Sequence, residues 1–254
     1  MEAIEPPEFG LNAQQVGSIL HRILELVYSQ AGENTSVEHL LGLLKAVSGD
    51  VFRTAPKKYG FRPSPLWQIE QSQFMDMLQE SINALEAESK GWKPAAFEKK
   101  FGFNNEPYLS LDLGTEVILL RGFIDRVDKT SSGVIRVVDY KTGSSHLSKR
   151  DFEEGRRLQL PIYALAAQDA LKLGHVAEGF YWSIKDAKAS SFKLSKYKND
   201  GGQGLPAARK VMIEHIQNSL SGIRSGEFPP RPPTGGCPKY CPAAQWCWRY
   251  QAGW

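Results

Sequence analysis

The stretch at residues 121–143, RGFIDRVDKTSSGVIRVVDYKTG, constrains the fold most strongly. Two apolar, β-branched runs flank a turn-forming segment, which predicts two strands joined by a short antiparallel connection. Side chains alternate between faces along a strand, so Asp139 and Lys141 share one face. If the loop has an odd number of residues, such as the five at 130–134, Asp125 falls opposite Asp139 on that face. An even loop would separate the two acids.

These acids and the lysine carry a specific chemistry. Two carboxylates held together on an apolar strand repel each other, so their ionised forms need a cation. Hard oxygen ligands suit Mg²⁺ or Mn²⁺. A lysine two residues beyond an acid can orient a water beside such a metal and stabilise charge that develops during a displacement at phosphorus. The alternative interpretation is a surface hairpin with an Asp–Lys pair, which is the more frequent meaning of an isolated Asp-x-Lys.

Composition sets the limits for the whole chain. The 254 residues are 41% hydrophobic and 11% aromatic, which is enough for one large domain or one domain with appendages. The net charge of +3 permits an anionic partner without requiring one. Residues 1–10 are acidic and Pro-rich, and no apolar run is as long as a membrane span, so we expect a soluble protein of the cytoplasm with no membrane partner.

The first predicted element is an amphipathic helix at residues 13–30, with apolar residues at helical spacing. His21 lies at the edge of its apolar stripe, on the same side as Gly17, where the glycine would let another element or a metal centre approach. A lone histidine in this position is more often a packed or solvent-facing residue.

A helical insertion is predicted at about residues 35–92. Residues 35–38 resemble a capping box that opens a short helix through Leu44, and Pro65 opens a longer helix that runs to about Lys90. The basic residues of the link between these helices are interpreted as solvated charge, with phosphate contact as the alternative: Arg53, Lys57, Lys58 and Arg62.

Strands are predicted at residues 95–103 and 108–113, and with the two strands around residues 116–141 they form a four-stranded meander. Glu98 is interpreted as the polar side of an edge strand, and its alternative is a further acid near the metal. An amphipathic helix at residues 156–173 places Gln159 and Tyr163 on one face, and a strand follows at 175–185. This strand–helix–strand order predicts a partly parallel sheet and an α/β domain.

The C-terminal region contains all three cysteines, Cys237, Cys241 and Cys247, after a final helix at 205–224 and a Pro-rich segment. Three cysteines cannot form a disulfide framework, so the cluster indicates a metal site. Zinc and iron–sulfur sites usually take four protein ligands, and this tail supplies three.

The ordered set of motifs resembles a known family. The signals are His21 in GSILHRILE, Asp125 in GFIDRVD, Asp139 and Lys141 in VVDYKTG, and Gln159 and Tyr163 in LQLPIYALAA. In order and spacing they are similar to the motifs of RecB/AddB-type nucleases of the PD-(D/E)XK superfamily. The resemblance covers residues 21–247.

The resemblance implies a restriction-endonuclease-like α/β fold, a mixed central sheet flanked by helices. The nuclease domain would span residues 1–234, with the Cys-rich tail at 235–254 packed on the same domain. By the same resemblance, a divalent Mg²⁺ or Mn²⁺ ion is held by His21, Asp125, Asp139 and the backbone carbonyl of Tyr140. The remaining catalytic residues are Lys141, which assists the attacking water, and Gln159 and Tyr163, which support the site and the DNA.

Iron–sulfur members of the family place three cysteines after the nuclease core and a fourth before the histidine helix. No cysteine precedes His21 here, and the first pair is spaced C-x₃-C, whereas two intervening residues are typical of many relatives. We therefore expect a [4Fe-4S] cluster on Cys237, Cys241 and Cys247 only if a fourth ligand comes from outside this chain. Otherwise Trp246, Trp248 and Tyr250 would hold the tail by packing on the core.

The sequence thus predicts a metal-dependent DNA nuclease, the exonuclease module of a helicase–nuclease used in DNA repair or recombination. Its expected partners are DNA, including single strands, and a helicase domain or subunit. One alternative is a catalytically silent DNA-binding or scaffold module of the same fold, although an inactive module has no chemical need for Asp125, Asp139 and Lys141 together. A simple zinc-stabilised interaction domain is a third hypothesis. Cleavage polarity and endonuclease versus exonuclease mode stay open.

Overall fold

The computed structural model describes residues 10–143, 148–200, 202–230, 232, 236–237, 241 and 243–251. The chain divides into two compact units, Met1–Met212 and Ile213–Trp254. All the strands described below belong to the first unit. None of the described helices is long and apolar enough to cross a membrane.

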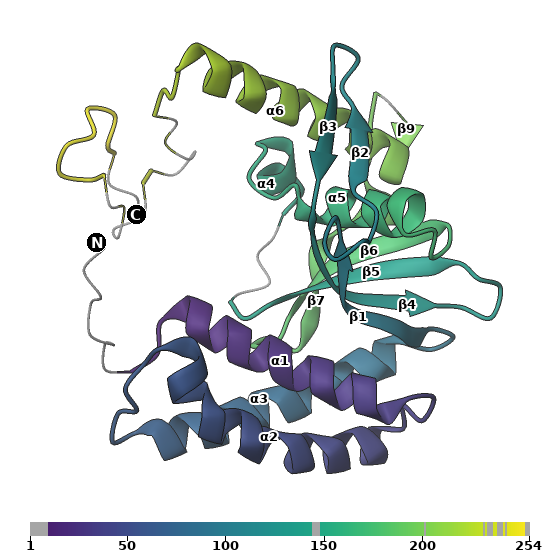
Figure 1. Ribbon diagram of the computed structural model, residues 1–254, viewed down its shortest axis with the longest axis vertical. Helices are drawn as coiled ribbons and strands as arrows, with labels where there is room; N and C mark the ends of the chain where they lie inside the picture. Colours follow the sequence, from purple (N-terminus) through teal and green to yellow (C-terminus); the bar gives the residue numbers. More distant parts are fainter. Residues whose placement is uncertain are drawn as a thin grey trace. The chain divides into compact units, whose positions relative to one another are not determined.

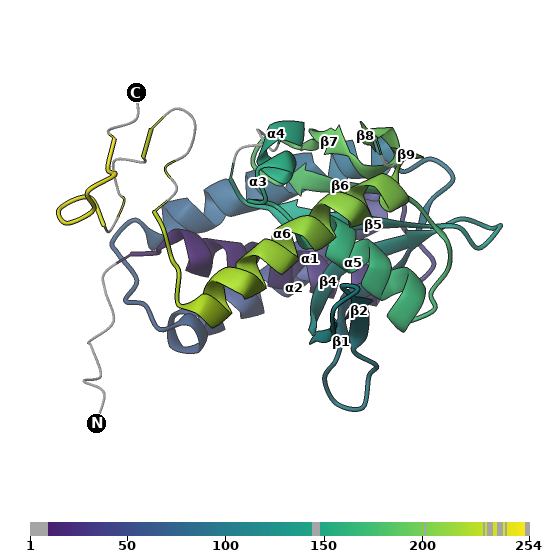
Figure 2. The same cartoon turned by 90° about the horizontal axis from the view of Figure 1, so that it is seen from above.

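Three helices form a layer on one face of the central sheet, namely α1 (Ala13–Ala31), α2 (Val37–Tyr59) and α3 (Trp67–Glu88) (Figure 1, Figure 2). The first begins at a capping box in which Asn12 and Gln15 exchange side-chain and backbone hydrogen bonds. Its apolar stripe is buried in one cluster with residues of α2, α3 and the sheet. The predicted helix at residues 13–30 is confirmed.

The second helix is longer than predicted, since it continues to Tyr59 instead of ending near Leu44. Its apolar stripe continues through Val51 and Phe52, which are buried against the neighbouring helices. Ser36 is the N-cap but its side chain makes no capping bond, so the predicted capping box does not form. The basic residues assigned to a link therefore lie on the helix itself: Arg53, Lys57 and Lys58.

The central sheet has the strand order β1-β4-β5-β6-β7. These strands are β1 (Lys93–Phe101), β4 (Gly122–Lys129), β5 (Ile135–Lys141), β6 (Val176–Ser183) and β7 (Lys188–Lys193). Only the β5–β6 pair is parallel, as predicted from the strand–helix–strand order. The first six residues of β5 are all buried, because helices cover both faces of the sheet. The mixed, helix-flanked sheet confirms the predicted fold class.

The predicted four-stranded meander is wrong. The strands β2 (Leu109–Asp112) and β3 (Val117–Leu120) form a separate hairpin, and β1 pairs directly with β4. Gly102 makes this possible, since its φ is +71° and an added Cβ would lie 2.5 Å from the Cβ of Arg121. The chain leaving β1 therefore passes against the start of β4, and the hairpin rises away from the sheet (Figure 1).

The connection between β4 and β5 has an odd length, the alternative that places Asp125 opposite Asp139. Lys129 pairs with Ile135, so residues 130–134 form a five-residue loop, and Arg126 pairs with Val138. The next positions in this register are Asp125 and Asp139. The hairpin prediction is confirmed.

The other face of the sheet is covered by α5 (Gln159–Leu165) and the π-helical segment η1 (Ala166–Ala170) (Figure 2). The predicted helix at 156–173 therefore begins at Gln159 and changes to a π-helix at Ala166. The helix packs closely on the sheet, because an added Cβ at Gly179 of β6 would lie 3.3 Å from the Leu160 side chain. The remaining elements are α4 (Lys149–Glu153), η2 (Leu194–Lys196), β8 (Lys198–Asn199), β9 (Gly202–Gln203) and α6 (Leu205–Ser225).

A buried ion network joins the helical layer to the sheet. The Arg126 guanidinium donates to Asp128, and the Arg136 guanidinium donates to the other oxygen of the same carboxylate. Arg126 also donates to Glu86 of α3 and lies over the ring of Tyr28 of α1. Since Arg126 and Asp128 are fully buried, each charge depends on these partners.

Within the second unit, Cys237 is buried and Cys241 and Cys247 are half-buried, all as free thiols. The rings of Trp246 and Trp248 are 78% and 76% exposed. The packing of the tail on the first unit stays a prediction.

Candidate metal centre and active site

Three side chains from three elements converge on one point. His21 of α1, Glu98 of β1 and Asp125 of β4 each offer a ligand atom, and these atoms all lie within 4.8 Å of one another. His21 Nδ1 is 3.6 Å from Asp125 Oδ2 and 3.9 Å from Glu98 Oε1. A cavity of about 430 Å³ opens beside them, and its lining includes Gly17, His21 and Glu98. A ligand entering this cavity can reach the cluster.

The position of His21 follows from the packing of α1. Its ring makes an edge contact with the Tyr140 ring, with centroids 5.8 Å apart. One turn earlier, an added Cβ at Gly17 would lie 3.8 Å from the Thr142 side chain just after β5. The element that neighbours Gly17 is thus the end of β5, at an ordinary van der Waals distance that an alanine would also allow.

The two acids of the hairpin lie in different surroundings. Asp125 Oδ2 accepts a hydrogen bond of 2.8 Å from the backbone N–H of Tyr140. Burial and the nearby charge of Asp139 raise the pKa of Asp125 to about 7. Burial also raises the pKa of Asp139, which is only 1% exposed, although Lys141 opposes the shift. Both acids carry unfavourable negative charge unless a cation compensates it.

Lys141 connects the second acid to α5. Its Nζ forms an ion pair with Asp139 and donates a hydrogen bond of 3.0 Å to Gln159 Oε1. Gln159 Nε2 in turn donates to the Tyr163 hydroxyl at 3.4 Å, so the two residues share one helix face as predicted. Burial and the charges of Asp139 and Asp125 raise the pKa of Tyr163 to about 12, which keeps its hydroxyl protonated.

The donor set fits a divalent metal. One imidazole nitrogen and two carboxylate oxygens already lie within reach of a single ion. Asp139 Oδ2 is buried and accepts no hydrogen bond of proper geometry, although it contacts the Lys141 ammonium. Asp125 and Asp139 together carry more negative charge than the Lys141 ammonium balances, and a divalent cation would stabilise this arrangement.

Glu98, which the sequence pattern favoured as the polar side of an edge strand, lies in the converging group. The predicted meander placed another strand between β1 and β4, which would have separated Glu98 from Asp125. Direct pairing of β1 with β4 instead puts Phe97 opposite Arg126 and Lys99 opposite Ile124, with Glu98 and Asp125 between them. Glu98 also has a φ of 42°, a conformation that few side chains adopt, and this local backbone geometry has no sequence signal.

The three cysteines are not assembled in the same way. Among the described residues, the group of potential metal ligands that converges is His21, Glu98 and Asp125, and Cys237, Cys241 and Cys247 do not form another. The assignment of these cysteines to a cluster stays a prediction.

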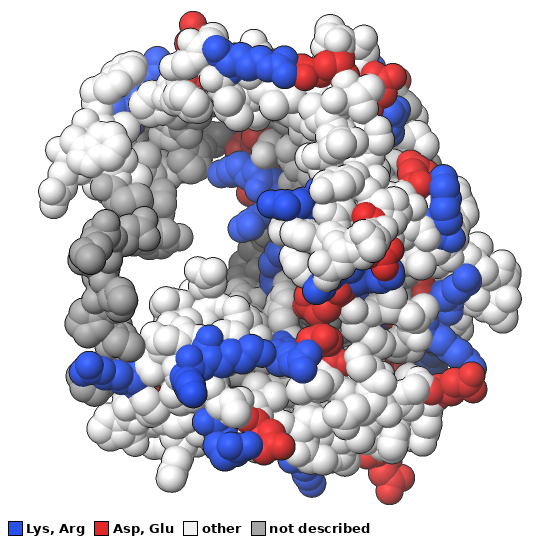
Figure 3. Space-filling model, viewed as in Figure 1, with Lys and Arg blue, Asp and Glu red and all other residues white. Residues whose placement is uncertain are grey.

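The molecular surface carries both acidic and basic side chains near the metal centre. On the face seen in Figure 3, a small group of acidic side chains near α1 and the central strands lies between basic side chains on either side. A polyanion could therefore contact basic groups while one of its phosphates lies at the acidic centre, provided that a metal neutralises the acids.

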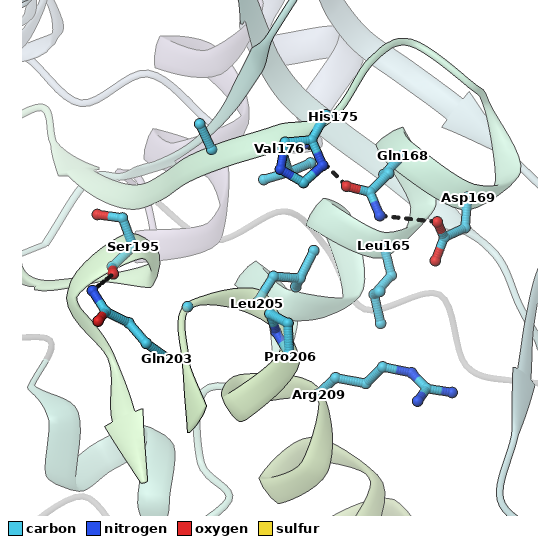
Figure 4. A pocket seen from close by; sticks show the side chains of 12 residues that line it. Leu165, Gln168, Asp169, His175, Val176, Ser195, Gln203, Leu205, Pro206 and Arg209 are labelled. Carbon is cyan, nitrogen blue, oxygen red and sulfur yellow. Dashed lines mark hydrogen bonds between the residues drawn. The ribbon is translucent and has the colours of Figure 1, made fainter. Parts of the chain in front are cut away.

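A second cavity of about 640 Å³ lies apart from this site, among η1, the start of β6, β9 and the start of α6 (Figure 4). Its polar lining includes Gln168, whose Oε1 accepts a hydrogen bond from the Val176 backbone, and Arg209 of α6. None of the predicted site residues lines it.

Comparison with protein families finds a match over residues 2–248, nearly the whole chain, to the PD-(D/E)XK nuclease superfamily. The chain belongs to this superfamily. The superfamily assignment agrees with the helix-flanked mixed sheet and with the resemblance seen in the sequence motifs.

Curated relatives of this superfamily member include three bacterial proteins that are each named as a subunit of an ATP-dependent helicase/deoxyribonuclease. The protein from Clostridium tetani is 30% identical over 64% of this chain and 15% of its own length. That from Carboxydothermus hydrogenoformans is 26% identical over 86% of this chain and 22% of its own length. That from Moorella thermoacetica is 34% identical over 48% of this chain and 11% of its own length. The chain thus spans less than a quarter of these relatives.

A solved structure described as "Crystal structure of SSO0001" covers 96% of this chain and 98% of its own, with a TM-score of 0.33 and 9% identity. This similarity is too low to support an inference.

Proposed function

We propose that this domain is a divalent-metal-dependent deoxyribonuclease, the exonuclease module of a helicase–nuclease that acts in DNA repair or recombination. The observation that carries the proposal is the convergence of His21, Glu98 and Asp125 beside the buried Asp139–Lys141 pair. A superfamily of nucleases supplies the reaction class, and the relatives named as deoxyribonuclease subunits support DNA as the substrate.

The metal ligands would be His21, Asp125 and Asp139 with the Tyr140 carbonyl, and we add Glu98 to this set because of its position. When bound, Mg²⁺ or Mn²⁺ polarises a phosphoryl oxygen and lowers the pKa of a coordinated water. The protein's own contribution is to hold three carboxylates in a partly buried site, where their charge favours a cation over a proton at neutral pH.

Lys141 would act on the attacking water and on the charge of the transition state. Its ammonium is held between Asp139 and the Gln159 amide, so its direction is fixed before substrate arrives. Gln159 and Tyr163 would orient Lys141 through successive hydrogen bonds. These two residues therefore position the lysine and the DNA.

The proposed partners are DNA, including single strands, and a helicase domain or subunit in a bacterial cytoplasm. The support is the name of the relatives, which are subunits of a helicase/deoxyribonuclease. For the tail, we propose that Cys237, Cys241 and Cys247 hold an iron–sulfur cluster only with a fourth ligand from outside this chain.

The direct test is incubation of the purified protein with end-labelled single- and double-stranded DNA in Mn²⁺, in Mg²⁺ and in EDTA. Cleavage that needs the metal and disappears in Asp139→Ala supports the proposal. Intact DNA in all three conditions, with a folded protein that still binds DNA, would instead establish the catalytically silent module.

A further inference from the structure

A small aromatic and basic surface lies at the end of the β1–β4 pair. The rings of Phe103 and Phe123 lie 5.0 Å apart at an interplanar angle of 35°. The Arg121 guanidinium carbon is 4.8 Å from the centre of the Phe103 ring, and Lys100 Nζ is 5.7 Å from that of Phe123. We call Lys100, Phe103, Arg121 and Phe123 the aromatic platform.

The platform is open to solvent. Phe123 is 40% exposed, Phe103 is half-buried, and both cations are exposed. Single exposed apolar residues are normal on protein surfaces and need no special explanation. Two adjacent rings with a cation over each differ from such single residues. Packing does not require them, because a polar residue in place of either ring would cost little buried surface. The arrangement offers aromatic faces and positive charge together.

The platform is continuous with the metal centre. Phe123 precedes Asp125 by two residues on β4, so the two residues lie about 7 Å apart along the strand. Lys100 pairs with Phe123 and follows Glu98 by two residues on β1. The two strands that supply carboxylates to the centre therefore supply the platform as well.

The residues next to the platform in sequence contact α5. The Phe101 ring makes an edge contact with Tyr163, with centroids 6.3 Å apart. An added Cβ at Gly122, the residue before Phe123, would lie 3.7 Å from the Tyr163 ring. Because Phe123 lies two residues from Asp125 on β4, a strand of nucleic acid whose phosphate lies at the centre would have its neighbouring nucleotide within reach of the platform.

We propose that Phe103 and Phe123 stack an unpaired nucleobase next to the cleaved phosphate, while Lys100 and Arg121 contact the flanking phosphates. Base stacking on aromatic side chains and electrostatic contact with the backbone are the two means by which proteins bind single strands without reading sequence. Bases within a duplex are already stacked and cannot reach the rings. The platform thus selects single-stranded DNA or a frayed end, a selection that rests on the proposed nuclease function.

The test measures binding of a fluorescent single-stranded oligonucleotide and of its blunt duplex to the full chain in EDTA, where cleavage is absent and the platform needs no metal. Phe103→Ala and Phe123→Ala should each lower single-strand affinity by about 5- to 150-fold, the range expected for loss of one stacked base. Duplex affinity should stay within about twofold. Phe123→Trp should retain the affinity, and Ile69→Ala, which removes an exposed apolar side chain of α3, should leave it unchanged.

A second readout uses the unaltered protein. An abasic nucleotide moved along the oligonucleotide should weaken wild-type binding at one or two adjacent positions, and Phe123→Ala should lose that sensitivity. Equal affinities for Phe123→Ala and wild type, no position-dependent abasic effect, or no single-strand affinity at all would overturn the proposal. If Phe123→Ala does not fold, the abasic series and Phe123→Trp decide.

Cleavage is measured separately in Mn²⁺, so that the two proposals fail in different ways. Stacking-dependent binding without any cleavage would remove the nuclease function and keep the platform. If cleavage depends on the metal but the Phe103 and Phe123 variants bind single strands as the wild type does, the nuclease function is kept and the platform is removed.

Discussion

The backbone N–H of Tyr140 donates a hydrogen bond of 2.8 Å to the carboxylate of Asp125. Asp125 lies on β4, and Tyr140 directly follows Asp139 on β5. This bond holds Asp125 beside Asp139 even though the two carboxylates repel each other. The closeness of the acids is therefore built into the backbone of the β4–β5 hairpin and does not depend on a bound ion.

Replacement of Asp139 separates function from folding. Asp139→Ala should abolish cleavage, because a metal ligand is lost, while the thermal unfolding midpoint of the metal-free protein stays the same or rises since a buried charge is removed. The measurements are cleavage of labelled DNA in Mn²⁺ and thermal unfolding in EDTA. Asp50→Ala, which removes an acid on the surface of α2, is the matched control. Undiminished cleavage by Asp139→Ala would remove this acid from the active site.

Lys141 should act mainly on the chemical step. Lys141→Ala should lower the single-turnover rate by about 10²- to 10³-fold, the loss typical of one group that stabilises transition-state charge. The affinity for DNA should change by only a few fold. Lys149→Ala, on the exposed side of α4, provides the comparison. Equal losses in binding and rate would show that Lys141 is a phosphate anchor instead.

Glu98 should contribute to metal affinity. Glu98→Gln should weaken Mn²⁺ binding by at least about tenfold, measured by calorimetry, because one of the two carboxylates in the converging group loses its charge. Glu106→Gln is a suitable control, since Glu106 pairs with Lys99 and is not part of the converging group. The same Mn²⁺ affinity in Glu98→Gln and wild type would leave Glu98 outside the coordination sphere.

The metal-free protein should lose stability as pH rises toward neutrality. The pKa of Asp125 is about 7 in the folded chain against an ordinary value of 3.8, so folding disfavours the ionised form and stability falls between about pH 4 and pH 7. Burial alone would lower the pKa of His21, but Glu98, Asp125 and Asp139 raise it, so His21 also loses stabilisation as pH increases. Thermal unfolding in EDTA at pH 5.5 and pH 8 measures this slope. Saturating Mn²⁺ should raise the midpoint more at pH 8, and a flat profile in EDTA would contradict the predicted charge repulsion.

Local patterns predicted the parts of the site that lie close together in sequence. The turn length between β4 and β5 fixed the register of Asp125 and Asp139, and the helical spacing fixed Gln159 and Tyr163, because both relations depend on backbone periodicity alone. The choice of partner for β1 was different. It depends on a close backbone contact between Gly102 and Arg121, which no local pattern connects, so the meander error also hid Glu98.

The length of α2 illustrates the same limit for helices. The basic residues after Leu44 suggested a solvated link, whereas burial of Val51 and Phe52 against α1 and α3 outweighs that local polarity. Tertiary packing decides such boundaries, and a single sequence contains no direct record of it.

Adjacent residues of β4 have opposite electrical surroundings, with Asp125 at the metal centre and Arg126 in the buried ion network. A slip of this strand by one residue would place a guanidinium in the cation site and a carboxylate beside Glu86, and it would move Asp128, on the same strand, away from Arg136. Both errors would be penalised together. The sheet therefore has one electrostatically acceptable alignment, and the fidelity with which β4 pairs during folding is also the fidelity with which the active site is assembled.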